Sequence, residues 1–276
     1  MLIQDFVKLL TESGIEQNEA NIEVKLLLEA AGYSLVDIIS GKKLDNDTLK
    51  KVEFMVKERI KTRKPIQYII GLADFMGEKF LVNESVLIPR DETELLVRKA
   101  VEIIKENKFK TIMDMCSGSG CIACMIAKLS QATVMGVDIS TEALHVALSN
   151  MEKLALFNRA TFRKSNLFEK IREDERFDMI VSNPPYIAPK FRQTLQKEVK
   201  FEPEIALFTK DEKGIEFYEK ISANAPKYLN KGGYLMFEIG IEQSKDVADI
   251  MNNNGFSDIK ILKDLAGIER VIWGKI

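Results

Sequence analysis

From residue 91 onward, short apolar runs of strand length alternate with longer amphipathic runs of helix length. The β-branched and apolar runs predict strands at 111–115, 133–138, 160–164, 177–182, 233–239, 257–263 and 269–274. Helical spacing of apolar residues predicts helices at 92–107, 120–129, 141–154, 212–228 and 242–253. This alternation predicts an α/β fold, a Rossmann-like, doubly wound and mostly parallel seven-stranded sheet. Ligands of such sheets bind at the carboxyl ends of the strands.

The region before residue 91 has a different pattern. Residues 1–64 carry apolar stripes at helical spacing only, which predicts a small N-terminal helical bundle ending before Pro65. Residues 65–90 contain two short β-prone runs, Gln67–Gly71 and Phe80–Asn83, and predict a β-hairpin linker. We therefore expect three parts, at 1–64, 65–90 and 91–276.

The segment Thr111–Gly120 is a predicted strand that runs into a glycine turn and opens a helix. Gly118 and Gly120 permit a positive φ and a close approach of the backbone to a ligand, and the helix offers free N–H groups and a positive dipole end. Asp138 closes the next predicted strand, where its carboxylate can accept both hydroxyls of a ribose. The pattern also fits the dinucleotide fingerprint. By itself it leaves open a nicotinamide cofactor, S-adenosylmethionine or a purely structural turn.

The tetrapeptide Asn183–Tyr186, Asn-Pro-Pro-Tyr, directly follows the predicted strand 177–182. Consecutive prolines stop both helix and strand pairing and remove two N–H donors. The turn therefore presents acceptors, the Asn183 side-chain oxygen and the Pro184 carbonyl, beside the Tyr186 ring. Such a turn suits an –NH2 group whose nitrogen is to be methylated, because it can accept both N–H bonds. The alternative is an ordinary end of a strand.

Two further segments have two readings each. Asn166 and Leu167 follow the predicted strand 160–164, where they either contact an adenine or form a plain loop. The basic stretch Lys50–Lys64 is either a solvated helix face or a docking patch for an RNA-associated partner.

Composition narrows the class of function. The net charge is −2, from 40 basic and 42 acidic residues, so no basic field indicates non-specific binding to nucleic acid. No run approaches the roughly 18–20 apolar residues of a membrane span, and the N-terminus lacks a signal-peptide pattern. The 3 cysteines cluster within one segment and favour a reducing compartment, so we expect a cytoplasmic protein without a metal. Cys121 and Cys124 have the spacing of a redox pair but lie in an apolar helical run.

Together, the glycine loop, Asp138 and Asn183–Tyr186 resemble class I S-adenosylmethionine-dependent methyltransferases that act on planar –NH2 nitrogens. More specific segments resemble the HemK-type release-factor glutamine methyltransferases. These segments are 65–71, 87–94, 201–207, 237–240 with Gln243, and 264–267. The family methylates the glutamine of the Gly-Gly-Gln loop in peptide chain release factors. The resemblance covers about residues 65–276 and implies that 91–276 is the methyltransferase domain. Because every chemical motif lies beyond residues 1–64, we expect this helical part to recognise the substrate.

The resemblance also implies roles for single residues. The methionine end of S-adenosyl-L-methionine would be wrapped by Cys116, Ser117, Gly118, Ser119 and Gly120. Asp138 would hold the ribose, Asn166 and Leu167 would lie by the adenine, and Asn183 would lie near the cofactor as well. The substrate glutamine would be held by Asn183, Pro184, Pro185 and Tyr186. Three positions depart from the family pattern: Asp91 for proline, Cys116 for glycine and Asn166 for aspartate.

Other functions remain compatible with parts of the sequence. A methyltransferase for a ribosomal-protein glutamine or for an adenine amine in nucleic acid would use the same chemistry. A nicotinamide oxidoreductase would explain the glycine loop but not Asn183–Tyr186, and a non-catalytic assembly factor would need only cofactor binding. We expect a monomer that acts on release factors, without sequence-specific nucleic acid or a membrane as partner.

Overall fold

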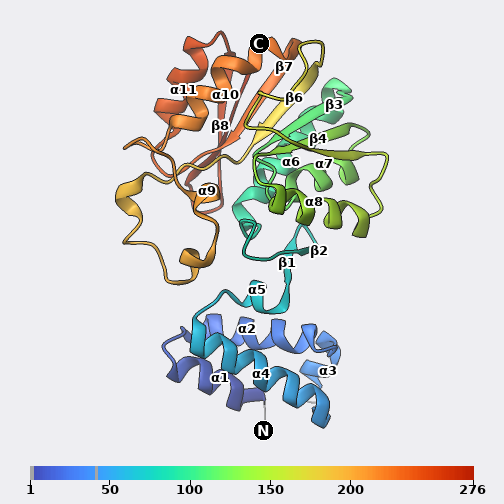
Figure 1. Cartoon of the computed structure of the whole chain (residues 1–276), viewed down its shortest axis with the longest axis vertical. Helices are drawn as coiled ribbons and strands as arrows, with labels where there is room; N and C mark the ends of the chain where they lie inside the picture. Colours follow the sequence, from blue (N-terminus) through green and yellow to red (C-terminus); the bar gives the residue numbers. More distant parts are fainter. Residues whose placement is uncertain (1–2, 41–42) are drawn as a thin grey trace. The chain divides into compact units, whose positions relative to one another are not determined.

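The computed structural model describes residues 3–40 and 43–276 (Figure 1). The chain divides into two compact units. The first, the helical unit, consists of residues 1–72 together with 196–201. The second, the sheet unit, consists of residues 73–195 and 202–276. Among the described residues, no helix is long and apolar enough to span a membrane.

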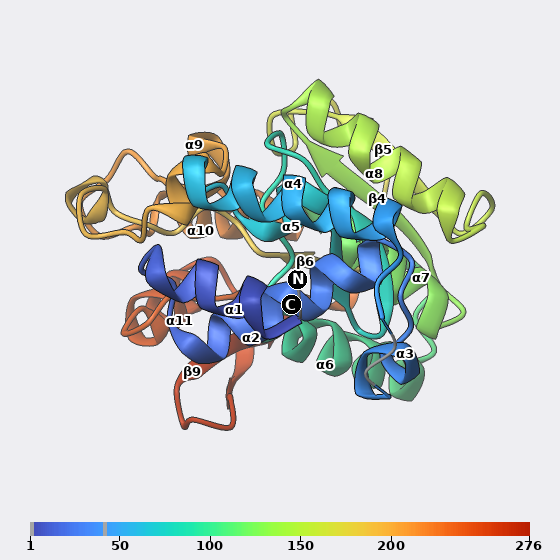
Figure 2. The same cartoon turned by 90° about the horizontal axis from the view of Figure 1, so that it is seen from below.

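The helical unit contains five α-helices within the described residues. They are α1 (Ile3–Glu12), α2 (Gln17–Ala30), α3 (Leu35–Ile39), α4 (Asn46–Thr62) and α5 (Ile66–Ile70), joined by the 3-10 turn η2 (Glu198–Phe201). Helices α1, α2 and α4 lie side by side in both views (Figure 2) and contact one another. Their apolar stripes, including Phe6, Leu27 and Val52, form a common core, which confirms the predicted helical region. Residues 1–2 and 41–42 of that region lie outside the described residues.

One prediction for the basic stretch Lys50–Lys64 is wrong. Arg59 is neither solvated nor part of a surface patch, because its side chain is only 1% exposed. Its Nε donates to Glu23 and its Nη1 to Glu198, at 2.9 and 3.0 Å. A buried guanidinium needs such carboxylate partners, since an unpaired charge in the interior is costly. Lys57 and Lys61 of the same helix remain exposed.

The linker is only partly a hairpin. Strands β1 (Leu72–Phe75) and β2 (Glu78–Leu81) form a two-stranded sheet around Met76 and Gly77, which both have positive φ, as a tight hairpin turn requires. The run Gln67–Gly71, predicted to be β-prone, is instead helix α5. Pro65 precedes the helix and Gly71 ends it with a left-handed φ of 73°, while Ile66 packs into the core of the helical unit.

The sheet unit contains the predicted seven-stranded sheet, in the order β5-β4-β3-β6-β7-β9-β8. Its strands are β3 (Thr111–Met115), β4 (Thr133–Asp138), β5 (Ala160–Lys164), β6 (Phe177–Ser182), β7 (Leu229–Glu238), β8 (Ser257–Lys263) and β9 (Glu269–Lys275). β9 is antiparallel to both of its neighbours, and the remaining pairs are parallel. The chain leaves β3 toward β4 and returns on the other side as β6, so the switch point lies between β3 and β6.

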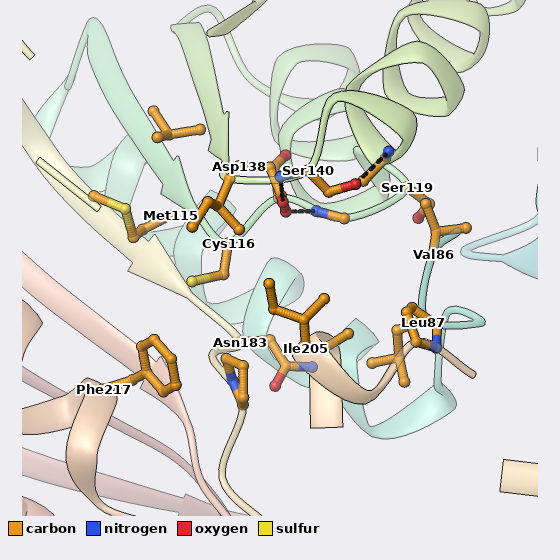
Figure 3. A pocket seen from close by; sticks show the side chains of 18 of the residues that line it. Val86, Leu87, Met115, Cys116, Ser119, Asp138, Ser140, Asn183, Ile205 and Phe217 are labelled. Atoms are coloured by element: carbon orange, nitrogen blue, oxygen red, sulfur yellow. Dashed lines mark hydrogen bonds between the residues drawn. The ribbon is translucent and has the colours of Figure 1, made fainter. Parts of the chain in front are cut away.

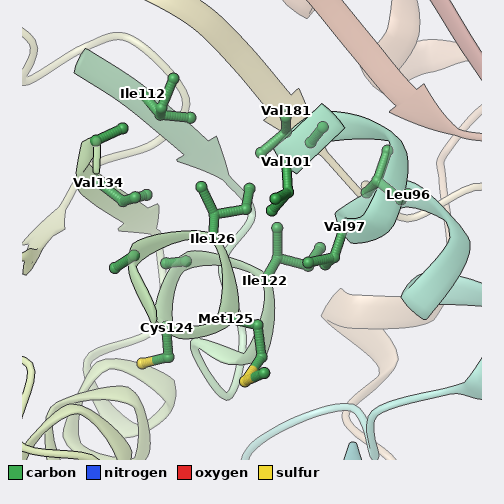
Figure 4. Packing of buried hydrophobic residues seen from close by; sticks show 14 of the residues in the cluster. Leu96, Val97, Val101, Ile112, Ile122, Cys124, Met125, Ile126, Val134 and Val181 are labelled. Atoms are coloured by element: carbon green, nitrogen blue, oxygen red, sulfur yellow. The ribbon is translucent and has the colours of Figure 1, made fainter. Parts of the chain in front are cut away.

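Helices cover both faces of this sheet. One face packs against α6 (Asp91–Asn107), α7 (Cys121–Leu129) and α8 (Thr141–Lys153), and the other against α10 (Glu216–Asn224) and α11 (Ser244–Asn253). A hydrophobic core lies on each face of the sheet, the first under α6, α7 and α8 and the second under α10 and α11. Successive residues of β6 point to opposite faces, so Val181 packs in the first core and Ile180 in the second. Figure 4 shows Ile122 and Ile126 of α7 among the residues packed in the first core.

The segment after β6 is less regular than predicted. It contains α9 (Glu204–Leu207) and the 3-10 turns η1 (Pro189–Phe191) and η3 (Ala225–Lys227). The helix predicted at 212–228 is shorter, because the Asp211 carboxylate accepts the N–H groups of Lys213, Ile215 and Glu216 and so forms a turn before α10. Beyond Asn224, Pro226 cannot continue the α-helix.

Candidate active site

A cavity of about 520 Å³ opens at the carboxyl ends of β3, β4 and β6 in the sheet unit (Figure 3). Of the residues predicted for the site, those on its wall are Cys116, Ser117, Gly118, Ser119, Asp138, Asn166, Leu167, Asn183 and Pro185. Gly120, Pro184 and Tyr186 are not on the wall. The parallel register explains the convergence, because Met115 pairs with Ser182 and with Val137, so the residues that follow emerge together.

Asp114, which was not predicted as a site residue, holds the glycine loop in place by hydrogen bonds. Its Oδ2 accepts the Ser117 hydroxyl at 2.7 Å and the Ala123 N–H at 3.2 Å, which ties the loop to the first turn of α7. Burial raises the pKa of Asp114 to about 7, and its Oδ1 has no hydrogen-bond partner among the described residues. An acidic residue inside an apolar strand, just before a glycine turn, is the signal that could have identified it.

The two loop glycines serve different purposes. Gly118 has a φ of +52°, and a Cβ added there would meet no atom within 4 Å. At Gly120, with a φ of +77°, a Cβ would lie 2.8 Å from the Phe162 ring and 2.9 Å from the Ala147 Cβ. Gly120 is therefore required for packing between α7, α8 and the sheet, whereas the backbone at Gly118 is open to the cavity.

Asp138 ends β4 and connects to the same loop. Its Oδ2 accepts the Gly118 N–H at 2.8 Å, and its Oδ1 accepts the Ser140 N–H at 2.9 Å. Burial raises the pKa of Asp138. Each carboxylate oxygen has a second lone pair. The side chain lines the cavity, so it can still accept hydroxyl groups there.

Asn183 lies on the cavity wall opposite the glycine loop (Figure 3). Its Nδ2 donates to the Thr93 Oγ1 of α6 at 3.3 Å, a bond that leaves the side-chain oxygen available as an acceptor. Thr93 is buried and was not predicted as part of the site.

The turn that follows Asn183 is locked by Gln243. The Gln243 Nε2 donates to the Tyr186 and Gly214 carbonyls at 3.1 and 3.2 Å, and its Oε1 accepts the Gly240 N–H at 3.0 Å. A Cβ at Gly214 would lie 2.1 Å from the Tyr186 carbonyl oxygen, so this contact requires glycine. Tyr186 is thus fixed through its backbone, and burial raises the pKa of its hydroxyl.

A second unpredicted pair lies at the cavity. The Arg90 Nη2 lies 2.7 Å from both carboxylate oxygens of Glu202, which is buried. Arg90 lines the cavity, and so does Ile205 of α9, an exposed apolar residue. Both charged residues belong to segments that carry the family resemblance, but nothing in their sequence positions, 112 residues apart, shows that they pair.

The three departures from the family pattern each have a local structural setting. Cys116 has a left-handed φ of 62°, the conformation that favours glycine. Asp91 is the first residue of α6, where a proline and an acidic side chain are both favourable. The Asn166 Nδ2 donates to Glu169 Oε1 at 2.6 Å, a bond that an aspartate could not donate.

The cysteines do not support redox chemistry. All three are free, and Cys121 and Cys124 are buried in α7. Burial raises the pKa of the Cys121 thiol to about 12, so the reactive thiolate is disfavoured. Among the residues that the structure describes, no group of three or more His, Cys, Asp and Glu side chains could hold a metal ion.

Comparison with known proteins places this chain in a family. Residues 1–71 match the PrmC N-terminal domain, and residues 91–201 match the methyltransferase small domain. The release factor glutamine methyltransferase of Geobacter sulfurreducens is 40% identical over 97% of this chain and 93% of its own length. The protein of the same name from Fusobacterium nucleatum is 42% identical over 85% of this chain and 66% of its own length.

Solved structures agree on the fold. A methyltransferase from Pyrococcus furiosus has a TM-score of 0.52 at 18% identity, covering 79% of this chain and 96% of that one. The family models and the relative from Geobacter sulfurreducens together match both units of the chain. The chain belongs to the family of release factor glutamine methyltransferases.

Proposed function

We propose that this protein transfers a methyl group from S-adenosylmethionine to the side-chain amide nitrogen of the Gly-Gly-Gln glutamine in peptide chain release factors. One observation carries the proposal. The ends of β3, β4 and β6 bring the glycine loop, Asp138 and Asn183 to the wall of a single cavity.

The cavity residues fit S-adenosylmethionine. A volume of about 520 Å³ lies within the roughly 300–1,000 Å³ usual for pockets that hold a small ligand. The open backbone at Ser117 and Gly118 would hold the methionine end, Asp138 the ribose hydroxyls and Leu167 the adenine. When bound, the cofactor supplies an electrophilic methyl group.

The part assigned to Asn183 follows from the chemistry of an amide. An amide nitrogen is a poor nucleophile, because its lone pair is delocalised into the carbonyl group. An acceptor that holds an N–H bond can turn the lone pair out of this conjugation and toward the methyl group. Asn183 lies on the cavity wall, and its side-chain oxygen is available as an acceptor because its Nδ2 donates to Thr93. The Pro184 carbonyl, the second acceptor expected from the sequence, does not line the cavity, so Asn183 carries the larger share of this proposal.

The test compares three variants on intact release factor. Asn183→Ala should lower the rate of methyl transfer by about a hundredfold or more while S-adenosylmethionine binding is kept, because it removes an orienting bond. Asp138→Ala should weaken S-adenosylmethionine binding about ten- to a hundredfold, the usual effect of losing a charge-assisted hydrogen bond. Asn253→Ala, an exposed asparagine on α11, is the matched control and should behave as the unaltered protein.

Mass spectrometry of the release factor gives the rate and the modified residue, and calorimetry gives the affinity for S-adenosylmethionine. If Asn183→Ala methylates release factor at a rate within a few-fold of the unaltered protein, Asn183 is not the acceptor that orients the substrate amide. Methylation of a ribosomal protein or of nucleic acid, with release factor left unmodified, would favour the alternative substrates.

We further propose that the helical unit recognises the release factor, and that the protein acts in the cytoplasm as a monomer without sequence-specific nucleic acid. All residues that line the cavity belong to the sheet unit, so the helical unit is free for another task. It exposes large apolar side chains, with Phe54 of α4 at 69%. The net charge of −2 supports the proposal that nucleic acid is not a partner, and the free cysteines support the cytoplasm.

A pair of phenylalanines tests the recognition. Phe54→Ala should raise the KM for intact release factor with little change in kcat, because it removes binding that is equal in the ground and transition states. Phe157→Ala is the matched control, since Phe157 is 59% exposed in the sheet unit. Equal KM values for the two variants would show that Phe54 does not contact the substrate.

A further inference from the structure

Glu238 is a buried carboxyl group with no part in the function proposed above. It ends β7, is 2% exposed and does not line the cavity. Its Oε2 has no hydrogen-bond partner in the described part of the chain. An incompletely satisfied carboxyl group in a protein interior is unusual and costly. We therefore infer the role of Glu238 from the side chains that surround its carboxyl group.

The strand register places Glu238 beside Asn183. β6 and β7 are parallel, with Ser182 opposite Phe237, so the next residue of each strand emerges at the same edge of the sheet. The first turn of α6 adds Thr93, whose Oγ1 accepts the Asn183 Nδ2 at 3.3 Å. The side chains of Thr93 and Asn183 both interact with the Glu238 carboxyl group as hydrogen-bonding partners.

The hydrogen bonds among Asn183, Thr93 and Glu238 can form in only one direction when Glu238 is ionised. An ionised carboxylate only accepts hydrogen bonds, so Thr93 must donate its hydroxyl hydrogen to Glu238. The Thr93 oxygen is then an acceptor, and only the Nδ2 end of Asn183 can face it. A flipped amide would bring the Asn183 oxygen against the Thr93 oxygen and the carboxylate, with acceptor facing acceptor.

We propose that Glu238, through its contacts with Thr93 and Asn183, is a positioning residue that keeps the Asn183 amide nitrogen turned inward and its oxygen turned toward the substrate. This inference rests on the proposed role of Asn183 as the acceptor for the substrate amide. Glu238 itself touches neither substrate nor cofactor. Its substitution therefore changes the orientation of Asn183 rather than the volume or charge of the cavity wall.

The cluster should depend on pH. Burial raises the pKa of Glu238 to about 7, while the hydrogen bond from Thr93 acts to lower it. The titratable groups that face Glu238 from the neighbouring elements are Glu92, Cys121, Tyr186, Tyr218 and Arg270. Burial raises the pKa of both tyrosines and of the cysteine, so these three stay neutral near pH 7. Arg270 lies 3.0 Å from Asp264 and 3.6 Å from Glu92.

A protonated Glu238 can donate as well as accept, so the direction of the cluster is lost at low pH. We therefore expect kcat to fall as pH is lowered through about 7. Release factor and S-adenosylmethionine are kept saturating, so that changes in binding do not enter. Glu238→Gln should lower kcat about tenfold at pH 8, the effect of losing one orienting hydrogen bond. Its kcat should also no longer fall between pH 8 and pH 6.

Further variants separate positioning from a structural effect. Thr93→Val should lower kcat as Glu238→Gln does, whereas Thr93→Ser, which keeps the hydroxyl, should restore it. Glu92→Gln is the matched control: it removes a neighbouring negative charge, so the midpoint of the pH profile should move to lower pH with kcat at pH 8 unchanged. Adding Glu238→Gln to Asn183→Ala should lower kcat no further, because both act through one side chain.

The outcomes distinguish this inference from the proposed function. If Asn183→Ala is inactive while Glu238→Gln and Thr93→Val keep the kcat and pH profile of the unaltered protein, the positioning role is wrong and the function stands. If Asn183→Ala stays active, the proposed role of Asn183 as the acceptor for the substrate amide is itself wrong. A loss of kcat in Glu238→Gln that Thr93→Val does not share would also overturn the role of Thr93.

Discussion

Arg59 in the helical unit and two acidic residues in the sheet unit, Asp114 and Glu238, are all buried, but their charged groups are paired in different ways. In the helical unit, the Arg59 guanidinium has carboxylates on two sides, with its Nη1 3.0 Å from Glu198 and its Nε 2.9 Å from Glu23. In the sheet unit, Asp114 and Glu238 are also buried, but each has one carboxylate oxygen without a hydrogen-bond partner among the described residues.

The pKa values follow this difference. Burial alone would lower the pKa of Arg59, but Glu23 and Glu198 outweigh burial and raise it, so Arg59 stays charged. Burial raises the pKa of Asp114 and Glu238 to about 7, so small changes in pH near neutrality alter their charge. A paired buried charge holds neighbouring segments together, while a perturbed and incompletely paired one is typical of functional sites. The comparison therefore separates a structural charge cluster from one that serves the cavity.

The largest expected effect tests the structural side. Arg59→Met should lower the free energy of unfolding of the helical unit by about 3–5 kcal/mol, because Glu23 is left buried without a counter-ion. Arg98→Met is the matched control: Arg98 is 63% exposed and pairs with Glu94, so the loss should be about 0.5 kcal/mol or less. Urea denaturation measures both. A loss below about 1 kcal/mol for Arg59→Met would mean that the cluster is not structural.

The next effect tests the sheet unit through pH. The folded pKa of Asp114 lies above its ordinary value of 3.8, so the folded protein binds more protons than the unfolded chain between about pH 4 and 7. The contribution of Asp114 to stability is full below pH 4 and is lost as pH rises through about 7. Asp114→Asn should therefore make the decline in stability across this window shallower by up to about 1.4 kcal/mol per pH unit.

Denaturation curves at several pH values check this prediction. The decline that remains in Asp114→Asn should come largely from Glu238, whose pKa is raised in the same direction. An unchanged slope would show that Asp114 is not protonated in the folded protein near neutral pH.

The smallest effect concerns a single backbone angle. Cys116→Gly should stabilise the sheet unit by about 1 kcal/mol, because a left-handed φ costs a residue with a Cβ roughly that much. Greater flexibility of glycine in the unfolded chain acts against this gain. Thermal unfolding of Cys116→Gly, with Cys116→Ala as control, measures the balance. A lower melting temperature for the glycine variant than for the alanine variant would show that the angle carries no strain.

Sequence predicted the sheet well because its signals are local. Strands β3, β4 and β6 are short apolar runs bounded by turn residues, and parallel pairing then places their ends together whatever the details of packing. Asp138 and Asn183 could be predicted for the cavity on that basis alone. Helix α5 was missed because its β-prone isoleucines are overridden by Pro65 and Gly71 at its ends.

What escaped prediction depends on contacts between distant residues. Arg59 was read as a surface charge because its partner Glu198 lies 139 positions away. Thr93 and Glu238 are ordinary residues of a helix and a strand, and only the register of β6 and β7 brings Glu238 beside Asn183. Pro184 and Tyr186 were assigned to the site as part of a motif, but a motif does not show which of its side chains face a cavity.

The segment Gln196–Phe201 makes the helical unit discontinuous in sequence, with consequences for synthesis on the ribosome. Helices α1 to α5 emerge first, but Glu198, which pairs with Arg59 and Arg63, follows only after β3 to β6. The ribosome adds about 5–20 residues per second, and a domain usually folds as soon as its whole sequence has emerged. The helical unit must instead wait for Phe201 to leave the exit tunnel, so its completion is delayed until most of the parallel strands of the other unit already exist.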